Sequence, residues 1–389
     1  MRRVVVVGAG LAGARSVQEL RAQGFAGEVV LVGAEPHLPY DRPPLSKQVL
    51  QGQLDTTALD VAWSPLDVSL RLGTTATGLR PGVVQTSGGN LEYDGLVLSC
   101  GARAVLPAAW EGPRTHVLRT LDDSLRLRAQ LVPGARVVVV GAGWIGAEVA
   151  TAAAAAGCAC TVVEAAATPL AGALGEVGGW TAPWYATAGV DLRLSTAVAA
   201  IEPDAVLLDD AERLTADVVV VGVGARPDTA WLAGSGLELD QGVVVDEHLA
   251  ASQPGVVAVG DCAAWWSLRF GARLHVEHWD DALHAPAAAV STLLGRLVVH
   301  DPVPYFWSEQ LGHRLQHVGH AGAATRLVHR GEPGAADGWS VGWLDGDRLV
   351  ALLAVDRPRD LAQARRRIAD GSPVDPGRLA DLGVPVKSV

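Results

Sequence analysis

Two copies of one glycine pattern, Gly-x-Gly-x-x-Gly, stand far apart in the chain and indicate where phosphates would bind. The copies comprise Gly8, Gly10 and Gly13, and Gly141, Gly143 and Gly146. In this pattern the first glycine permits a tight turn, the second lets the backbone approach a pyrophosphate, and the third lets a helix pack closely on a strand. The free N–H groups at the start of that helix then face the phosphates. The sequence therefore predicts two dinucleotide-binding sites.

An acidic residue follows each glycine pattern at the sequence spacing typical of a ribose-binding carboxylate. Glu35 and Glu164 lie about 20 residues beyond the last glycine, where a carboxylate accepts hydrogen bonds from ribose hydroxyls. A carboxylate at Glu164 favours the free 2′-hydroxyl of NADH and repels the 2′-phosphate of NADPH. The residues after Glu164, 165–168, include no arginine to hold a phosphate. The second site is therefore predicted to prefer NADH.

The elements around the two patterns repeat as well, so the glycines are not merely turns of an ordinary sheet. Each pattern follows a run of four valines, typical of a buried parallel strand, and precedes a helix-forming stretch and a second strand. The expected elements are strands 4–7 and 28–32 with helix 14–23, and strands 137–140 and 160–163 with helix 147–156. These are two complete strand–helix–strand units of the Rossmann type.

The remaining chain completes an α/β protein. Further buried strands are expected at 96–101, 218–221 and 256–261. After residue 304 the pattern changes to irregular or antiparallel strands at 305–320 and 338–354 and a helix at 361–369. We therefore predict two Rossmann-type dinucleotide-binding domains and a small α+β C-terminal domain. The expected boundaries are 1–114 with 240–303 for the first, 115–239 for the second and 304–389 for the third.

Composition excludes several other classes of function. A net charge of −11 argues against binding nucleic acid, which requires a basic surface. The four cysteines are too few and too scattered for a disulfide framework, and the apolar run after Arg3 is too short for a signal peptide. No transmembrane segment is expected. These features predict a cytoplasmic protein that binds neither a membrane nor nucleic acid.

The segment 39–47, Pro-Tyr-Asp-Arg-Pro-Pro-Leu-Ser-Lys, resembles a signature of oxygenase-coupled ferredoxin reductases. These NADH-dependent FAD enzymes feed Rieske dioxygenases and haem monooxygenases through a small iron–sulfur protein. The resemblance continues, in order, through the segments 118–123, 141–148, 224–227, 259–263, 276–279 and 304–310, and so spans nearly the whole chain. The first fold lacks the Cys-x₄-Cys of disulfide reductases in the wider glutathione-reductase-like superfamily, so no thiol relay is expected.

This resemblance implies that FAD occupies the first fold and NADH the second. In the family, Arg42 lies towards the FAD pyrophosphate and Lys47 beside the isoalloxazine ring, where a cation stabilises the charge built up on reduction. Without the resemblance, both residues would be expected to lie in a solvated surface loop, because arginine and lysine are mostly exposed. Asp261 hydrogen-bonds the ribityl chain of FAD in the family, and its alternative role is the N-cap of a helix opening at Ala263.

Lys47 and Glu148 are the candidate catalytic residues. In the family, an acid at Glu148 approaches the nicotinamide carboxamide and pairs with the flavin-site lysine. The alternative is that Glu148, on the first turn of the second dinucleotide helix, only compensates the helix dipole.

The late motifs add four candidate cofactor-binding residues: Glu277, His278, Trp279 and Trp307. Large aromatic faces such as those of Trp279 and Trp307 can stack on flavin and nicotinamide rings and exclude water. Because the chain has 12 tryptophans, simple packing is the alternative. A nearby group of histidines, His313, His317 and His320, would not share one face of a strand, so no metal site is expected.

Three positions depart from the family pattern. Cys100 replaces a threonine and loses a hydroxyl contact, Asp281 replaces an asparagine and adds charge near the flavin edge, and Gly172 replaces an arginine and weakens docking of an acidic ferredoxin. The function implied is that of an FAD-dependent NADH:ferredoxin oxidoreductase, acting as a monomer or homodimer. The alternatives are an NADH oxidase, a flavoenzyme acting directly on a small molecule, and a redox-sensing flavoprotein.

Overall fold

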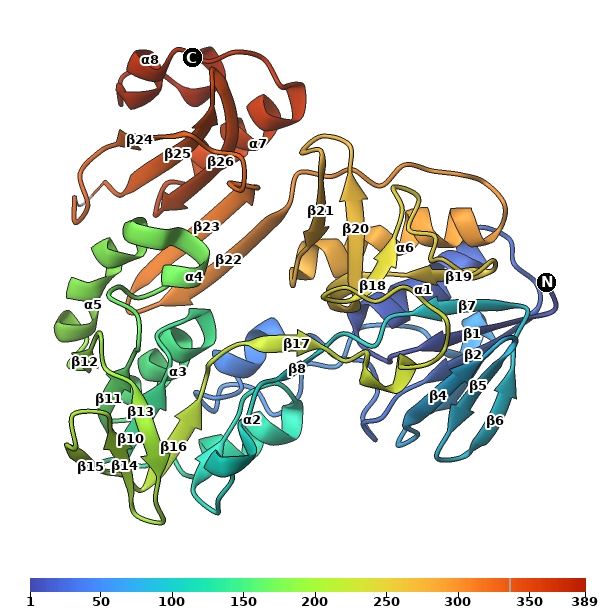
Figure 1. The fold of residues 1–389 in the computed structure, drawn as a ribbon, viewed down its shortest axis with the longest axis horizontal. Helices are drawn as coiled ribbons and strands as arrows, with labels where there is room; N and C mark the ends of the chain where they lie inside the picture. Colours follow the sequence, from blue (N-terminus) through green and yellow to red (C-terminus); the bar gives the residue numbers. More distant parts are fainter. Residues whose placement is uncertain (336) are drawn as a thin grey trace.

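The computed structural model describes residues 1–335 and 337–389. Two parallel β-sheets, each with its own helices, lie beside each other, and a third, antiparallel sheet forms the C-terminal end of the molecule (Figure 1). The α/β class and its three-part organisation are as predicted.

The first sheet is built around the first valine run, whose Val4–Val7 side chains are at most 4% exposed. Its parallel strands are, in spatial order, β19 (Val256–Ala258), β7 (Gly95–Leu98), β1 (Arg3–Val7), β2 (Glu28–Val32) and β3 (Val68–Arg71). Two helices that pack on each other, α1 (Leu11–Ala22) and α6 (Trp279–Leu293), also contact this sheet. A small antiparallel sheet accompanies it, formed by β4 (Ala76–Arg80), β5 (Val83–Thr86) and β6 (Gly89–Glu92).

The second sheet repeats this plan around the second valine run. Its parallel strands are β12 (Asp191–Arg193), β11 (Ala159–Val163), β10 (Arg136–Val140), β16 (Val218–Val221) and β9 (Thr115–His116). Its helices are α2 (Leu121–Arg128), α3 (Trp144–Ala155), α4 (Ala171–Leu174) and α5 (Ala182–Thr187). An antiparallel sheet also accompanies this half, formed by β13 (Val198–Ile201), β14 (Ala205–Leu208) and β15 (Arg213–Thr215).

Both helices after the glycine patterns begin directly after the second glycine, three residues earlier than predicted. The third glycine of each pattern therefore lies inside the helix. A Cβ on Gly13 would overlap the carbonyl oxygen of Gly8, and one on Gly146 would overlap that of Gly141. The third glycine thus permits the close approach of helix and strand that the pattern predicts.

One strand pair connects the two parallel sheets, and a further small sheet follows it in the chain. The chain crosses between the parallel sheets at β8 (Ala102–Ala104) and β17 (Ala225–Pro227), which pair antiparallel. A further small sheet contains β18 (Val243–Val245), β20 (Ala263–Ser267) and β21 (Ala272–His275). Ala263 therefore opens a strand, and the helix expected to start there, with Asp261 as its N-cap, was a wrong prediction. The segment before it, Gly260–Cys262, is one 3₁₀ turn.

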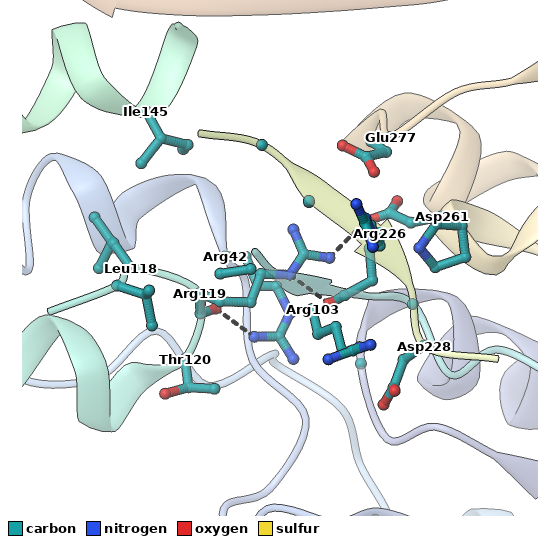
Figure 2. Close-up of a pocket in the computed structure, with 18 of the residues that line it drawn as sticks. Arg42, Arg103, Leu118, Arg119, Thr120, Ile145, Arg226, Asp228, Asp261 and Glu277 are labelled. Atoms are coloured by element: carbon teal, nitrogen blue, oxygen red, sulfur yellow. Dashed lines mark hydrogen bonds and ion pairs between the residues drawn. The ribbon is translucent and has the colours of Figure 1, made fainter. Parts of the chain in front are cut away.

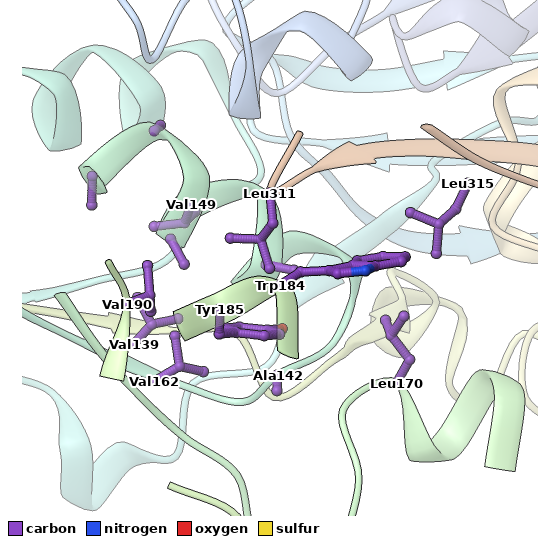
Figure 3. Packing of buried hydrophobic residues seen from close by; sticks show 14 of the residues in the cluster. Val139, Ala142, Val149, Val162, Leu170, Trp184, Tyr185, Val190, Leu311 and Leu315 are labelled. Carbon is purple, nitrogen blue, oxygen red and sulfur yellow. The ribbon is translucent and has the colours of Figure 1, made fainter. Parts of the chain in front are cut away.

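The C-terminal sheet is entirely antiparallel. Its strands are β22 (Tyr305–Gln310), β23 (His313–Gly319), β26 (Arg348–Val355), β25 (Trp339–Asp345) and β24 (Arg326–Arg330), with helices α7 (Pro358–Asp370) and α8 (Pro376–Ala380). One apolar cluster joins this sheet to the second parallel sheet, with the Trp184 ring of α5 beside Leu311 and Leu315 (Figure 3). In the described part of the chain, no helix is long and apolar enough to cross a membrane.

Candidate functional site

A large cavity of about 1810 Å³ lies between the two parallel sheets and reaches both glycine turns. It sits at the carboxyl ends of β1 and β10, where open α/β sheets bind their ligands. Of the sixteen predicted site residues, all but Gly13 and Gly146 line it. Those two glycines instead lie behind the wall, in the contact between helix and strand described above.

The two glycine turns have the geometry of phosphate cradles. Gly8 and Gly141 have φ values of +113° and +101°, a conformation that residues with a side chain rarely adopt. A Cβ on Gly8 would also overlap the carbonyl oxygen of Ser99. No atom lies within 4 Å of where a Cβ on Gly10 would stand, so the backbone faces open space. Each turn leads into the N-terminus of a 12-residue helix. Both turns therefore fit a dinucleotide pyrophosphate.

The two acids expected to bind ribose make different contacts. Glu35 accepts hydrogen bonds from the hydroxyl of Tyr40 at 2.6 Å and from the guanidinium of Arg42 at 2.9 Å. Glu164 instead accepts from the backbone N–H groups of Ala142 at 2.7 Å and Ala166 at 2.8 Å. The second carboxylate is thereby fixed beside its own glycine turn, with lone pairs left for a further donor.

Lys47 and Glu148, which both line the cavity, form an ion pair. The Lys47 Nζ lies 2.8 Å from Glu148 Oε2, and the side chains are 13% and 4% exposed. Glu148 is the fifth residue of α3 and so lies beyond its first turn. The alternative role, compensation of the helix dipole, is therefore wrong. The same carboxylate accepts hydrogen bonds from Ser46 at 2.5 Å and Ser308 at 2.6 Å, two residues that the sequence analysis did not single out.

Four arginines gather on one side of the cavity (Figure 2). They are Arg42, Arg103, Arg119 and Arg226, and all line the cavity. Arg119 donates to Asp261 at 2.6 Å, and its carbonyl oxygen accepts from Arg42 at 2.6 Å. Such a concentration of positive charge favours an anionic ligand. Arg119 lies within a motif segment, but its role depends on Asp261, 142 residues further along the chain.

Arg103 and Arg226 stand directly opposite each other in the β8–β17 pair. Two like charges at paired positions destabilise an antiparallel ladder unless an anion compensates them. The pair was not singled out from the sequence because its register depends on a contact between strands of the two halves.

The late motifs form another wall of the cavity. The indole N–H of Trp279 donates to Asp41 at 2.8 Å, and the Trp279 and Trp307 rings meet edge to face at 5.9 Å. Partial desolvation and the negative charge of Asp261 raise the pKa of Glu277. Two aromatic faces beside polar groups are suited to planar heterocyclic rings.

The three departures from the family pattern lie in different surroundings. Cys100 lines the cavity, and a hydrogen bond with the Cys262 thiol, together with burial, raises its pKa well above the usual range. Gly172 also lines the cavity, and no atom lies within 4 Å of where a Cβ on it would stand.

Asp281 does not itself line the large cavity, but its charge acts on His278, which does. It is 7% exposed, and it lines a separate cavity of about 200 Å³, where its Oδ1 lies 2.9 Å from His300 Nε2. The reason is its position on α6: Ala282 points towards the large cavity, and Asp281, one residue earlier on the helix, points elsewhere.

The histidines of the C-terminal sheet have separate partners. His313 hydrogen-bonds Asp356 at 2.8 Å, whereas His317 stacks on Phe306 and contacts the edge of Trp343. Within residues 1–335 and 337–389, no group of three or more potential ligands is arranged to hold a metal ion. Burial, with the neighbouring His278 and His320, lowers the pKa of His317 to about 3.

We expect His317 to make the protein less stable in acid. The unfolded chain takes up a proton on this histidine as the pH falls below about 6.5, whereas the folded chain does not until about pH 3, so stability falls across that interval. Between pH 7.5 and pH 4, wild type should lose roughly 3 kcal/mol more than a His317→Phe variant, which keeps an aromatic ring. Urea unfolding at both pH values measures this difference, and parallel losses in the two proteins would contradict it.

Comparisons with known proteins cover the whole chain. Residues 2–285 match the family model of pyridine nucleotide-disulphide oxidoreductases, and residues 305–389 match the reductase C-terminal model. The ferredoxin reductase component of chlorobenzene dioxygenase from Cupriavidus sp. (strain PS12) is 38% identical, over 97% of this chain and 95% of the relative.

Two solved structures are similar over nearly their full length. The crystal structure of Fdr9 is 47% identical, with a TM-score of 0.94 and 99% of both chains covered. The crystal structure of the covalent putidaredoxin reductase–putidaredoxin complex is 35% identical, with a TM-score of 0.95, covering 99% of this chain and 97% of that chain.

Proposed function

Since the chain belongs to the pyridine nucleotide-disulphide oxidoreductase family and ends in a reductase C-terminal domain, we propose that it is the NADH:ferredoxin reductase of an oxygenase system. The relatives support the choice of acceptor. One is the reductase component of a dioxygenase, and another was crystallised in a covalent complex with putidaredoxin. The partner proposed is therefore a small iron–sulfur protein of the ferredoxin type.

The two cradles divide the cofactors between them in this proposal. FAD lies along the first turn, in the domain of residues 1–114 and 240–303, and NADH lies along the second, in residues 115–239. Residues 304–389 form the third domain. FAD supplies the chemistry that the protein lacks, accepting a hydride and releasing single electrons. The observation that carries the proposal is that both cradles open into one cavity with the Lys47–Glu148 pair between them.

The side chains of the cavity would bind and orient the two nucleotides. Arg42 supplies positive charge for the FAD pyrophosphate, and Asp261 accepts from the ribityl hydroxyls. Lys47 donates towards the isoalloxazine ring, which gains negative charge on reduction. Glu148 holds Lys47 in place and faces the nicotinamide carboxamide. Trp279 and Trp307 exclude water from the two rings, with Glu277 and His278 beside them.

Rapid mixing of the FAD-loaded protein with NADH, without oxygen, tests the proposed function. We expect the flavin absorbance to bleach, and to return when a matching ferredoxin is chosen from a panel. Bleaching that no iron–sulfur carrier reverses would contradict ferredoxin as the acceptor. Rapid oxygen consumption by the protein alone would instead indicate an NADH oxidase.

Glu164 should make NADH the better donor by kcat/KM. Its carboxylate is fixed by two backbone N–H groups beside the second cradle, so it would accept from a ribose hydroxyl and repel a 2′-phosphate. We expect Glu164→Gln to reduce the preference for NADH over NADPH by about tenfold, since one charge–charge repulsion is removed. Steady-state kinetics with both nucleotides measure this preference as the ratio of the two kcat/KM values. An unchanged ratio would show that another residue selects the donor.

We also propose that the protein acts in the cytoplasm. All four cysteines are free thiols, as expected for a reducing compartment, and NADH is an intracellular donor.

A further inference from the structure

The C-terminal sheet reaches into the centre of the proposed redox site along helix α3. Trp144, Glu148 and Thr151 lie on one face of this helix, because residues three and four apart share a face. Strand β22 contacts α3 along this face. Trp144 meets the ring of Phe306 at 4.6 Å, Glu148 accepts from Ser308, and the Thr151 hydroxyl accepts from the N–H of Leu311 at 2.8 Å. The third domain is thus held against the helix that carries the candidate catalytic acid.

The two oxygens of Glu148 have different partners. Oε2 accepts from Lys47 and Ser46, both from the segment beside the first cradle. Oε1 accepts from Ser308 at 2.6 Å, and Ser308 is 1% exposed. Ser308 in turn accepts from Gln310 at 3.2 Å, which fixes its hydroxyl as the donor towards Glu148. A buried carboxylate held on both oxygens has one orientation, and so does the lysine paired with it.

We infer that Ser308 is a positioning residue for hydride transfer, acting from the C-terminal domain through Glu148 on Lys47. This inference rests on the proposed function. Without the Ser308 hydroxyl, Glu148 Oε1 loses its hydrogen bond, and the carboxylate is held only through Oε2, so its orientation is less firmly fixed. Lys47 Nζ keeps its hydrogen bond to the Pro43 carbonyl oxygen, but its position at the flavin edge is less firmly fixed because its ion-pair partner is more mobile. NADH binding depends mainly on the second cradle and should change little.

The test compares two buried serines that each donate to a buried carboxylate. Ser308→Ala removes the hydroxyl beside Glu148. Ser340→Ala is the matched control, because Ser340 is also 1% exposed and lies in the same sheet, but it donates to Asp360 at 3.1 Å, outside the site. Each holoenzyme is examined by anaerobic stopped-flow with NADH and by dye equilibration of the flavin midpoint potential.

In Ser308→Ala we expect the limiting rate of flavin reduction to fall about tenfold, while the dissociation constant for NADH stays within about twofold. The midpoint potential should become more negative, since a mobile Lys47 stabilises the reduced ring less. Ser340→Ala should match wild type in all three quantities. Unchanged rate and potential in Ser308→Ala, or equal changes in Ser340→Ala, would overturn the inference.

A second pair of variants covers the case in which Ser308→Ala does not fold. Threonine and valine have nearly the same shape and differ by one hydroxyl, so Ser308→Thr should be reduced faster than Ser308→Val. Equal rates would again contradict a positioning role. If wild-type holoenzyme itself is not reduced by NADH, the proposed function fails, and that result is separate from any difference between variants.

Discussion

Replacing Lys47 by methionine should slow flavin reduction by NADH about 100-fold, the usual effect of removing one donor aimed at developing negative charge. The Lys47 ammonium is 13% exposed and is held by Glu148 at 2.8 Å. Methionine keeps much of the side chain's length without its charge. Because the ring gains negative charge as the hydride arrives, the loss should affect the limiting rate more than the dissociation constant for NADH. Anaerobic stopped-flow separates the two quantities.

The chain offers a matched control for this substitution. Lys387 is its only other lysine; it lies in the last 3₁₀ turn and does not line the cavity. Lys387→Met should therefore be reduced at the wild-type rate.

Lys47→Met also leaves Glu148 buried without its ion-pair partner, which destabilises the fold. The double variant Lys47→Met, Glu148→Gln removes that unpaired charge. If it were reduced as fast as wild type, the catalytic role of the pair would be wrong.

Replacing Arg330 by methionine should lower the free energy of unfolding of the C-terminal domain by about 3 kcal/mol, because a buried network loses its central cation. Arg330 is 2% exposed and donates to Asp360 at 2.9 Å. It also donates to backbone carbonyls of the C-terminal segment, those of Leu379, Asp381, Leu382 and Val384. One side chain thus ties the end of the chain to β24.

The charge on Asp360 is part of the same network. Burial alone would raise the pKa of Asp360, but hydrogen bonds from Arg357 and Arg330 bring it below the usual value. Arg326, exposed on the same strand, provides the control, and Arg326→Met should stay within about 0.5 kcal/mol of wild type. Urea unfolding, monitored by tryptophan fluorescence, measures the free energy of unfolding of both variants. If Arg330→Met lost no more unfolding free energy than Arg326→Met, the buried network would contribute nothing to stability.

The repeated units could be predicted because their physical causes are local. A run of valines forms a buried strand, and a glycine at a fixed spacing permits a turn wherever it occurs. Even here the helix starts were misplaced by three residues, because the third glycine serves packing inside the helix. The expected helix at Ala263 failed for a similar reason: Asp261 was interpreted as a cap, but the segment after it pairs with β18 and β21.

The other parts of the site depend on contacts between distant segments. Ser308 and Glu148 are 160 residues apart, and Arg119 and Asp261 are 142 residues apart. No local sequence pattern predicts either of these contacts. Asp281 was assigned to the flavin edge from its position next to a motif, but a shift of one residue on a helix turned it towards His300. The motifs could predict which segments form the site, but not every contact within it.

The central claim is that two cradles in one chain bring two dinucleotides together in one cavity. A crystal structure of the reduced protein with FAD and NAD⁺ tests it most directly. We expect the FAD pyrophosphate at Gly10, the NAD⁺ pyrophosphate at Gly143, and the nicotinamide C4 about 3 to 3.5 Å from flavin N5 beside Lys47. Density for only one dinucleotide, or two rings held apart by protein, would contradict it.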